Sequence, residues 1–237
     1  QDKYLKGNSH NKYNVGYRTS VKLFKWLDFN FSGNYSMTDS QNDAPSYSSI
    51  ADLSRYQMLV NEDGSLVRDW ANYYGPNMLR HIPMESFPYS DWTQNLIEDR
   101  EGRDYSTKRT AVRAQGGLTA KIIKGLNIES KFQYEKIDSY TRNIDDESTW
   151  TVRSTINQAA SWDHATGAIT ANLPTGGILS QKKSSIDSWN WRNQINFDRS
   201  FNNDKHQISV IAGSELSSII GQGTKNAKTY GYNDDKL

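Results

Sequence analysis

Cysteine is absent from the 237-residue sequence, which excludes a disulfide scaffold and a thiolate-ligated metal site. Apolar residues are scarce too: they make up 35% of the chain, and its mean hydropathy is −0.83. No apolar run approaches the ~18 residues that a membrane-spanning helix needs, so a chain of this kind can cross a membrane only with strands. The net charge of +1 and the lack of a basic stripe give no indication of nucleic-acid binding.

Aromatic residues are plentiful by contrast. They account for 12% of the chain, with 14 Tyr and 7 Trp. Disordered segments tend to lack aromatics, so disorder does not explain the low aliphatic content. The combination suits strands that are apolar on one side only, together with large polar loops.

Period-two alternation is the strongest pattern in the chain. Near 13–23 one face carries apolar or aromatic residues and Thr19, whereas the other is polar, and the pattern restarts near 27–38. Alternation of this length predicts two strands, and the short link through Phe24–Trp26 makes them an antiparallel hairpin. Four further strands are predicted in the same way, near 108–122, 126–137, 186–198 and 206–217.

The links between hairpins are long, whereas those within them are short. The long connections run roughly over 39–107 and 143–185, and the first contains helical spacing between Ile50 and Val60. A compact soluble domain rarely tolerates such loops without structure of their own, so we expect them to fold into a cap. Transmembrane barrels combine short periplasmic turns with long extracellular loops. The predicted fold class is therefore all-β: an antiparallel transmembrane β-barrel segment of about six strands in three hairpins.

The polar faces of the strands leave two architectures open. In a large barrel such a face lines a wet lumen or contacts a plug, and on this register Arg18, Arg113 and Arg192 point to the lumen. In a soluble protein the same face meets bulk water, and the apolar face is buried by a second sheet. The second architecture fits a soluble all-β glycan-binding surface module.

Several segments resemble, in order and spacing, the SusC/RagA family of TonB-linked outer-membrane proteins from Bacteroidetes-type bacteria. The resembling segments are Phe24–Leu27, Ser54–Leu59 with Glu62–Gly64, Pro88–Trp92, Ile122–Ile128, Leu173–Leu179 and His206–Leu216. Each segment is short, and their ordered succession over nearly the whole chain carries the resemblance.

The resemblance implies an outer-membrane barrel of about 22 strands with a plugged lumen. It implies TonB-energised import of oligosaccharide or peptide, with a SusD-like surface lipoprotein closing over the extracellular mouth. The pattern departs from the family in that no plug domain or TonB-contacting region precedes Gln1, and 230–235 resembles an extracellular loop. The expected partners are thus the lipoprotein, the TonB complex through a region not present here, membrane lipid, and the remaining barrel and plug.

Loop aromatics are the candidate ligand-binding residues, because flat rings stack on sugars or grip peptide side chains. The candidates are Trp70, Tyr73, Tyr74, Tyr89, Trp92, Trp150 and Trp162. The same rings also suit packing of the loops against one another. For the three lumen-facing arginines, salt bridges to the plug and contact with substrate are the two interpretations.

Catalytic and metal chemistry find little support in the pattern. The acidic runs at 145–147 and 234–235 suit calcium ligation, or are simply solvated charges. No two histidines have metal-ligand spacing, and no nucleophile or acid–base motif is visible. We therefore expect neither an enzyme nor a cofactor. A glycan hydrolase stays open only as a third hypothesis.

Overall fold

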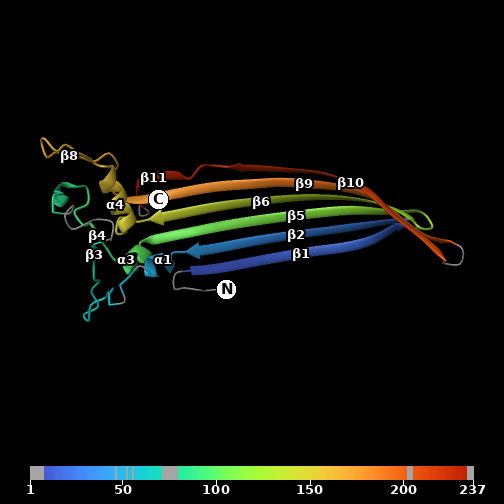
Figure 1. Ribbon diagram of the computed structural model, residues 1–237, viewed down its shortest axis with the longest axis horizontal. Helices are drawn as coiled ribbons and strands as arrows, with labels where there is room; N and C mark the ends of the chain where they lie inside the picture. The colour runs from blue at the N-terminus through green and yellow to red at the C-terminus, as the bar shows by residue number, and fades with distance from the viewer. Residues whose placement is uncertain are drawn as a thin grey trace.

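One long antiparallel sheet makes up most of the protein. The structure, a computed structural model, describes residues 8–45, 47–51, 53–54, 56–70, 80–201 and 205–233. The sheet strands are β1 (Asn8–Phe24), β2 (Leu27–Asn42), β5 (Arg103–Ile123), β6 (Leu126–Asp145), β9 (Gly177–Phe201), β10 (His206–Gly223) and β11 (Ala227–Tyr232). Their order is β1-β2-β5-β6-β9-β10, and β11 pairs with the part of β9 beyond the end of β10 (Figure 1). The antiparallel all-β fold class is confirmed.

Two tight turns close the first two hairpins at the end of the sheet away from the other elements (Figure 1). Lys25 and Trp26 link β1 to β2, and Lys124 and Gly125 link β5 to β6. Gly125 has a φ of +89°, and a Cβ there would lie 2.3 Å from the carbonyl oxygen of Asp198. The turn therefore requires glycine both for its backbone conformation and for the close approach of the neighbouring strand.

The strands are longer than the alternation predicts. β1 has 17 residues and β9 has 25, so the connections shrink from 39–107 and 143–185 to 43–102 and 146–176. The expectation of a loop at 230–235 is wrong over its start, because Tyr230 and Tyr232 pair with β9. Backbone hydrogen bonds continue the ladder wherever partners are present, whether or not the side chains alternate in polarity.

Strand register divides the side chains of the sheet into two faces. The apolar face carries Tyr13, Val15, Tyr17, Val21, Phe29, Phe31, Tyr35, Val112, Leu118, Ile128, Phe132, Tyr134, Trp189, Trp191, Ile195, Phe197, Val210, Leu216 and Ile220. The polar face carries Arg18, Ser32, Asn34, Arg113, Gln115, Lys131, Gln133, Glu135, Asn190, Arg192, Gln194, Glu215 and Ser217. Ile137, Ile186, Ile211 and Ile219 depart from this division and lie on the polar face, whereas Lys136 and Asp187 lie on the apolar face in the rung of Val112 and Ile220.

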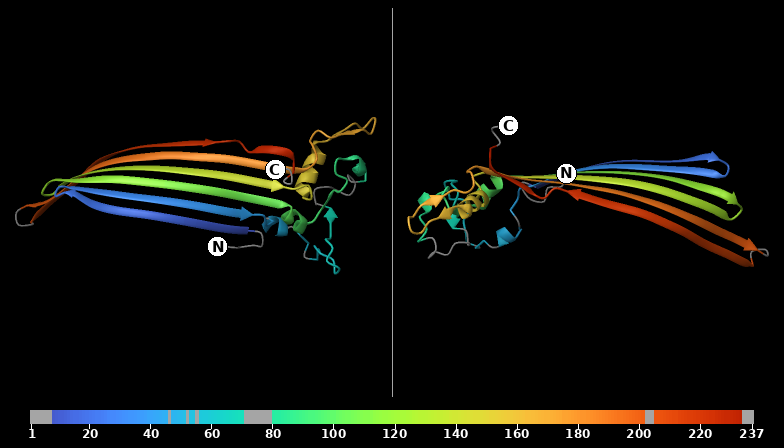
Figure 2. Two further views of the ribbon diagram at one scale, coloured as in Figure 1. Left: turned by 180° about the vertical axis from the view of Figure 1, so that it is seen from behind. Right: turned by 90° about the horizontal axis from the view of Figure 1, so that it is seen from above.

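The sheet is a single layer over most of its length. Seen from above, its strands follow one another in a twisted sheet, and the short elements gather at one end (Figure 2). None of the described helices is long and apolar enough to span a bilayer.

The loops fold into a cap at the end of the sheet opposite the tight turns (Figures 1 and 2). The cap contains α1 (Tyr47–Ala51), β3 (Asp69–Trp70), η1 (Met84–Ser86), β4 (Thr93–Gln94), α3 (Leu96–Glu101), α4 (Trp150–Ala159), β7 (Ser161–Trp162) and β8 (Ile169–Thr170). The helical spacing between Ile50 and Val60 was misleading: α1 ends at Ala51, and Val60 forms a bridge with Leu66.

A small apolar cluster joins the cap to the sheet. Val152 and Ile156 of α4 are fully buried against Ile178 of β9, which is 4% exposed. Tyr230 of β11 packs beside them. Ile178 and Tyr230 are register partners on the same side of the sheet as Arg192, so the cap rests on the polar face and leaves the apolar face uncovered.

Candidate functional site

The three arginines singled out in the sequence share the polar face. Arg18 stands opposite Ser32, whereas Arg113 and Arg192 stand opposite Glu135 and Lys131 on β6. Directly opposed residues of antiparallel strands project to the same side of a sheet. The register therefore gathers the three guanidinium groups from three strands onto one surface.

Charged groups of the polar face pair mainly with one another. Arg113 Nη2 donates to both carboxylate oxygens of Glu135, at 2.9 and 3.1 Å. Lys121 Nζ lies 2.7 Å from a carboxylate oxygen of Asp28. Exposed pairs of this kind contribute at most about 1 kcal/mol each, because water screens them. The pairs suit a surface that stays wet.

The apolar face is exposed in its central part. Val15 is 67% exposed, Phe132 50% and Val210 52%. Within the described part of the chain, no second sheet and no helix covers these side chains. A face of this composition needs an apolar surrounding that the described residues do not themselves supply.

Polar atoms on the apolar face find partners within it. The Tyr134 hydroxyl donates to Asp187 at 2.7 Å, and Trp191 Nε1 donates to the Ser130 hydroxyl at 3.0 Å. Satisfying these donors locally removes the cost of leaving them without water. These two aromatic donors therefore need no water, although the same face also carries the charged residues Lys136 and Asp187.

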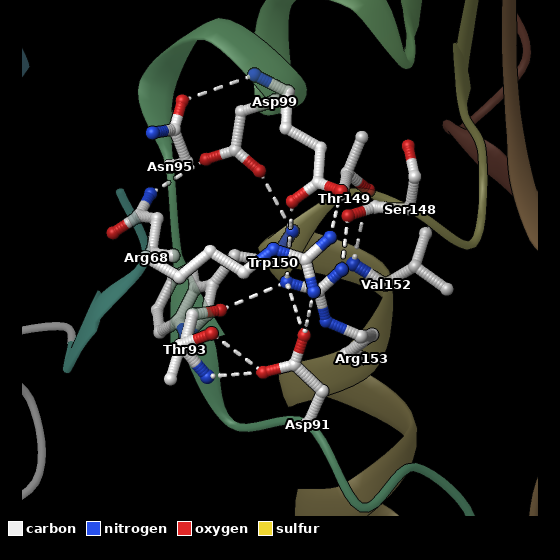
Figure 3. A network of polar contacts seen from close by, with 12 residues as sticks. Arg68, Asp91, Thr93, Asn95, Asp99, Ser148, Thr149, Trp150, Val152 and Arg153 are labelled. Atoms are coloured by element: carbon white, nitrogen blue, oxygen red, sulfur yellow. Dashed lines mark hydrogen bonds and ion pairs between the residues drawn. The ribbon is translucent and has the colours of Figure 1, made fainter. Parts of the chain in front are cut away.

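A buried arginine forms the centre of the cap (Figure 3). Arg153 of α4 is 6% exposed, and its Nη2 donates to the backbone carbonyl of Thr93 at 2.8 Å. Its Nη1 donates to the carbonyl of Ser148. Carboxylate oxygens of Asp91 and Glu98 lie 3.9 and 4.0 Å from Nη2. A cation held this way ties α4 to the segment that precedes α3.

Arg68 bridges the same two carboxylates from the outer side. Its Nη1 and Nη2 lie 2.6 Å from oxygens of Asp91 and Glu98. Burial acts to raise the pKa of Asp91, but hydrogen bonds from Thr93 and the charges of Arg153 and Arg68 outweigh it. The pKa of Asp91 consequently lies below its ordinary value of 3.8.

Two further buried side chains fasten the cap segments. Asn95 caps the N-terminus of α3, and its amide donates to the carbonyls of Leu59 and Val67 at 2.8 and 2.7 Å. Asp99, which is 1% exposed, accepts the backbone N–H of Trp150 at 2.7 Å. Figure 3 shows Asn95 and Asp99 near each other, both above Arg153 in this view. Segments distant in sequence are thus fixed by side-chain to backbone bonds.

The ends of β5 and β6 connect to the loop after β2 in the same manner. Tyr105 donates its hydroxyl to both carboxylate oxygens of Asp145, at 2.8 and 2.9 Å. Its backbone N–H donates to Asp43 at 2.7 Å. Burial raises the pKa of Asp43, and the hydrogen bond from Tyr105 opposes that rise.

Several candidate loop aromatics pack inside the cap. Tyr89 contacts the Val152 cluster, and its hydroxyl accepts the N–H of Gly176 at 2.8 Å. Trp92 is 6% exposed and meets the ring of Phe87 edge-on, with the ring centroids 5.1 Å apart. These rings bring loop segments together.

The remaining candidates differ in exposure. Trp70 on β3 is 45% exposed. Trp150, the first residue of α4, is partly buried, and the partly buried Trp162 stacks obliquely on His164 with ring centroids 4.0 Å apart. Two candidates, Tyr73 and Tyr74, lie outside the described residues. Trp70 is thus the described candidate most available to a ligand.

The acidic run at 145–147 is engaged in protein contacts. Asp145 accepts from Tyr105, and Asp146 accepts the N–H of Ser148 at 2.8 Å as well as its hydroxyl. In the parts of the chain that the structure describes, no group of three or more His, Cys, Asp or Glu has the arrangement of a metal site. The second run, 234–235, lies outside the described residues.

A polar cleft of about 640 Å³ opens where the cap meets β9 and β11. Its walls include Asp146 to Ser148, Thr175 to Gly177, and Gly231 to Asn233. Gly177 itself is buried, and a Cβ there would lie 2.9 Å from the carbonyl oxygen of Asp145, so the close approach of the two strands requires glycine. The backbone groups and short polar side chains of this cleft can form hydrogen bonds with many kinds of polar ligand.

Sequence reasoning missed the polar centre of the cap. Asn95 carries a recognisable signal, because Asn followed three residues later by Glu98 is typical of a helix N-terminus. The sequence around Arg153 carries no such signal, because its hydrogen-bond partners Thr93 and Ser148 can be identified only once the loops are folded.

Comparisons with known proteins agree with this geometry at the level of fold. No family model matches the chain, and no curated protein matches it. Among solved structures it is similar to the RagAB peptide transporter, at 13% identity and a TM-score of 0.65. It is likewise similar to the RagAB peptide importer in its "closed-closed" and "open-open" states, at 14% identity and TM-scores of 0.64 and 0.65.

These matches cover 96% of this chain but 22% of the chains it resembles. At such low identity they show a shared fold. The chains that share this fold belong to a peptide transporter and a peptide importer.

Proposed function

We propose that this chain forms part of the wall of an outer-membrane β-barrel importer of the SusC/RagA kind. It is not an enzyme, and its substrate is a peptide or an oligosaccharide. The similar structures are those of a peptide transporter and a peptide importer, which favours peptide of the two. One observation carries the proposal: an exposed apolar face backs a polar, charged face over the central part of the sheet.

The size of the apolar face supports a lipid environment. At roughly 75 Å² of exposed surface per side chain, the face amounts to roughly 1,500 Å². Leaving that area in water rather than in hydrocarbon would cost roughly 40 kcal/mol, which is a strong preference for lipid. Hydrocarbon removes this cost without a second protein layer.

Dimensions and polarity support the same assignment. The apolar stretch of β1, from Tyr13 to Leu23, spans roughly 28 Å of height if the strand tilts by ~40°, close to the ~25 Å band of barrel proteins. Tight turns lie at one end and the cap at the other (Figure 1). That arrangement fits periplasmic turns and an extracellular cap.

The polar face then lines the lumen, and the cap leans over it through α4 and Ile178. In this position Arg18, Arg113 and Arg192 face the plug or a passing substrate, and the exposed Trp70 is available to a ligand at the mouth. A SusD-like lipoprotein is the proposed partner at the cap, with TonB supplying energy through a part of the assembly outside this chain.

The outer edges of β1 and β10 need neighbours in this proposal. Unpaired N–H and C=O groups are not tolerated in hydrocarbon, so further strands of the barrel are expected beside them. The alternative, a soluble glycan-binding module, needs a second layer on the apolar face. Within the described residues only the two-stranded sheets β3-β4 and β7-β8 exist besides the main sheet, and both belong to the cap.

Fractionation of cells tests the proposal. The intact protein should sediment with outer membranes, resist extraction by alkaline carbonate and dissolve only in detergent. Deleting it should abolish growth on a peptide or oligosaccharide source that depends on it. Recovery as a soluble monomer after carbonate treatment would reject the membrane assignment and the transport role together.

A further inference from the structure

A belt of positive charge crosses the polar face between the middle of the sheet and the cap. Lys12 and Arg109 stand in one rung across β1, β2 and β5. Lys182 of β9 stands in the next rung toward the cap, and Lys228 of β11 stands in the rung after that. All four side chains are exposed. These four residues are called the cationic belt below.

The charge of the belt is not compensated within the described residues. Its three rungs carry no carboxylate in the described sheet, and no carboxylate lies within ion-pair distance of a belt residue. The helix α4, which packs on this face, contains no carboxylate either. In the rung beyond the belt, Asp145 stands opposite Arg103 and accepts from the Tyr105 hydroxyl, so its charge is already engaged.

The two faces of the same strands differ in charge at this level. On the outer face, Lys108 stands opposite Asp39, and Asp138 lies one rung away from Lys183. Positive and negative groups are therefore mixed there. Nearer the middle of the sheet the polar face is mixed as well, because it contains the ion pairs described above. The uncompensated positive charge is thus a feature of the cap side of the polar face.

The belt lies above the apolar band in the proposed orientation. Val112, the aliphatic residue of the apolar face nearest to the cap on β5, is three positions from Arg109. This separation is roughly 10 Å along the strand and roughly 8 Å in height if the strand tilts by ~40°. The belt therefore lies between the apolar band and the cap. A substrate that enters past the cap meets this part of the wall before it reaches membrane level.

The spacing of the belt residues lets their charges act together. Strands lie ~4.8 Å apart and successive rungs ~7 Å apart, so the backbones of neighbouring belt residues lie roughly 8–12 Å apart. The Debye length is ~10 Å at 0.1 M salt, so the fields of neighbouring cations overlap. A surface lined by one sign of charge raises the local concentration of ligands of the opposite sign, most strongly inside a cleft or lumen.

An aliphatic rung borders the belt on the side away from the cap. Ala111, Ile137 and Ile186 stand opposite one another, next to the rung of Lys12 and Arg109, and Ile186 is 40% exposed. Sugars are typically bound by stacking on flat aromatic rings. Within the described sheet, this rung and the two belt rungs nearest to it carry no Phe, Tyr or Trp on the polar face. Aliphatic groups beside cations suit a peptide that carries both apolar and acidic side chains.

We propose that the cationic belt binds the carboxylates of an acidic peptide on its way from the mouth into the lumen. The inference rests on the proposed function and names its substrate class, a peptide rich in aspartate and glutamate. The Arg109 guanidinium can hold a carboxylate with two parallel hydrogen bonds, and the lysines act as point charges. Serine and threonine hydroxyls of the same rungs can donate to further carboxylate oxygens.

Calorimetric titration of the intact protein in mild detergent tests the proposal. The probes are a short peptide in which glutamate alternates with leucine, the same peptide with glutamine or with lysine in place of glutamate, and a galacturonate oligomer. The test variant is Arg109→Gln with Lys182→Gln. The matched control is Lys108→Gln with Lys183→Gln, which removes equal charge from the adjacent residues of the same strands but on the outer face.

The wild type and the control should bind the glutamate peptide more tightly than the glutamine peptide, and the lysine peptide least. The test variant should lose about 2- to 30-fold in affinity for the glutamate peptide, from two contacts of the strength of exposed ion pairs. Its affinity for the glutamine peptide should stay unchanged. High salt should reduce the difference between wild type and test variant. A second variant, Arg109→Glu with Lys182→Glu, balances the belt and should bind the glutamate and glutamine peptides equally.

Three outcomes would overturn the assignment. An unchanged affinity of the test variant for the glutamate peptide would mean that the belt faces another part of the assembly. An equal loss in the test and control variants would mean that overall charge, and not the belt, attracts the peptide. Tighter binding of the galacturonate oligomer than of the glutamate peptide, lost in the test variant, would make the belt a site for an acidic sugar.

The two proposals fail separately. If the wild type binds the glutamate, glutamine and lysine peptides equally well, peptide transport stands and only the role of the belt is wrong. If the wild type binds no peptide, or is soluble after carbonate extraction, the proposed function fails, and the role of the belt fails with it.

Discussion

Replacing Phe132 by arginine tests the environment of the apolar face at its centre. Phe132 lies on the middle strand β6, between Gly116 on β5 and Trp191 on β9, and is 50% exposed. An arginine at the midplane of a bilayer costs about 2–4 kcal/mol on the lipid side of a barrel. The same change on a water-exposed surface is usually within about 0.5 kcal/mol. The two environments therefore differ by a measurable margin.

The assay is urea unfolding of the intact protein folded into lipid vesicles, followed by tryptophan fluorescence. Phe132→Arg should lower the free energy of unfolding by about 2–4 kcal/mol. Phe132→Leu, which removes the stacking on Trp189 but stays apolar, should cost no more than about 1.5 kcal/mol. Gln133→Arg, one residue away on the polar face, should stay within about 0.5 kcal/mol. A Phe132→Arg variant as stable as Gln133→Arg would refute the assignment of this face to hydrocarbon.

Two further predictions concern the cap. Arg153→Met should loosen it by about 2–6 kcal/mol, because the carbonyls of Thr93 and Ser148 each lose their donor at about 1–3 kcal/mol. Arg68→Met at the exposed side should cost about 1 kcal/mol or less. Hydrogen exchange of α3 and α4 compares the two, and equal protection in both variants would contradict the central role of Arg153. Folding lowers the pKa of Asp91 below its ordinary value of 3.8. The ionised carboxylate therefore contributes fully to the stability of the cap above pH 3.8, and this contribution is lost as the pH falls from there through the pKa of the folded state. The protection factors of the cap amides, which correct for the slower intrinsic exchange in acid, should therefore fall on acidification below that value, and less steeply in Asp91→Asn. An identical pH profile of the protection factors in the two proteins would exclude the carboxylate as the cause.

The ends of the strands are a feature that the sequence pattern does not predict correctly. On the apolar side, Lys108, Asp138 and Tyr140 continue strands whose alternation has already faded by Val112 and Tyr134. We attribute the fading to the surroundings: beyond the proposed apolar band both sides of the sheet meet water, so the two faces no longer differ in polarity. The backbone ladder extends regardless, and only coordinates reveal its length.

The cap illustrates a different failure. The residues from Ile50 to Val60 have the spacing of a helix. In the structure the helix ends at Ala51, and Val60 instead forms a β-bridge with Leu66. The loop aromatics Tyr89 and Trp92 were selected as ligand contacts, and the structure places them in the packing of the cap. Their ligand role stays a prediction.

The sequence by itself determined the division of the sheet into an apolar and a polar face, the three hairpins and the common side of Arg18, Arg113 and Arg192. A period of two is a property of the extended backbone, so these features are local and need no partner to be read. Only the tertiary structure decided which residues surround Arg153 and which face of the sheet the cap covers. Those arrangements join segments tens of residues apart, and their register depends on how every intervening strand pairs.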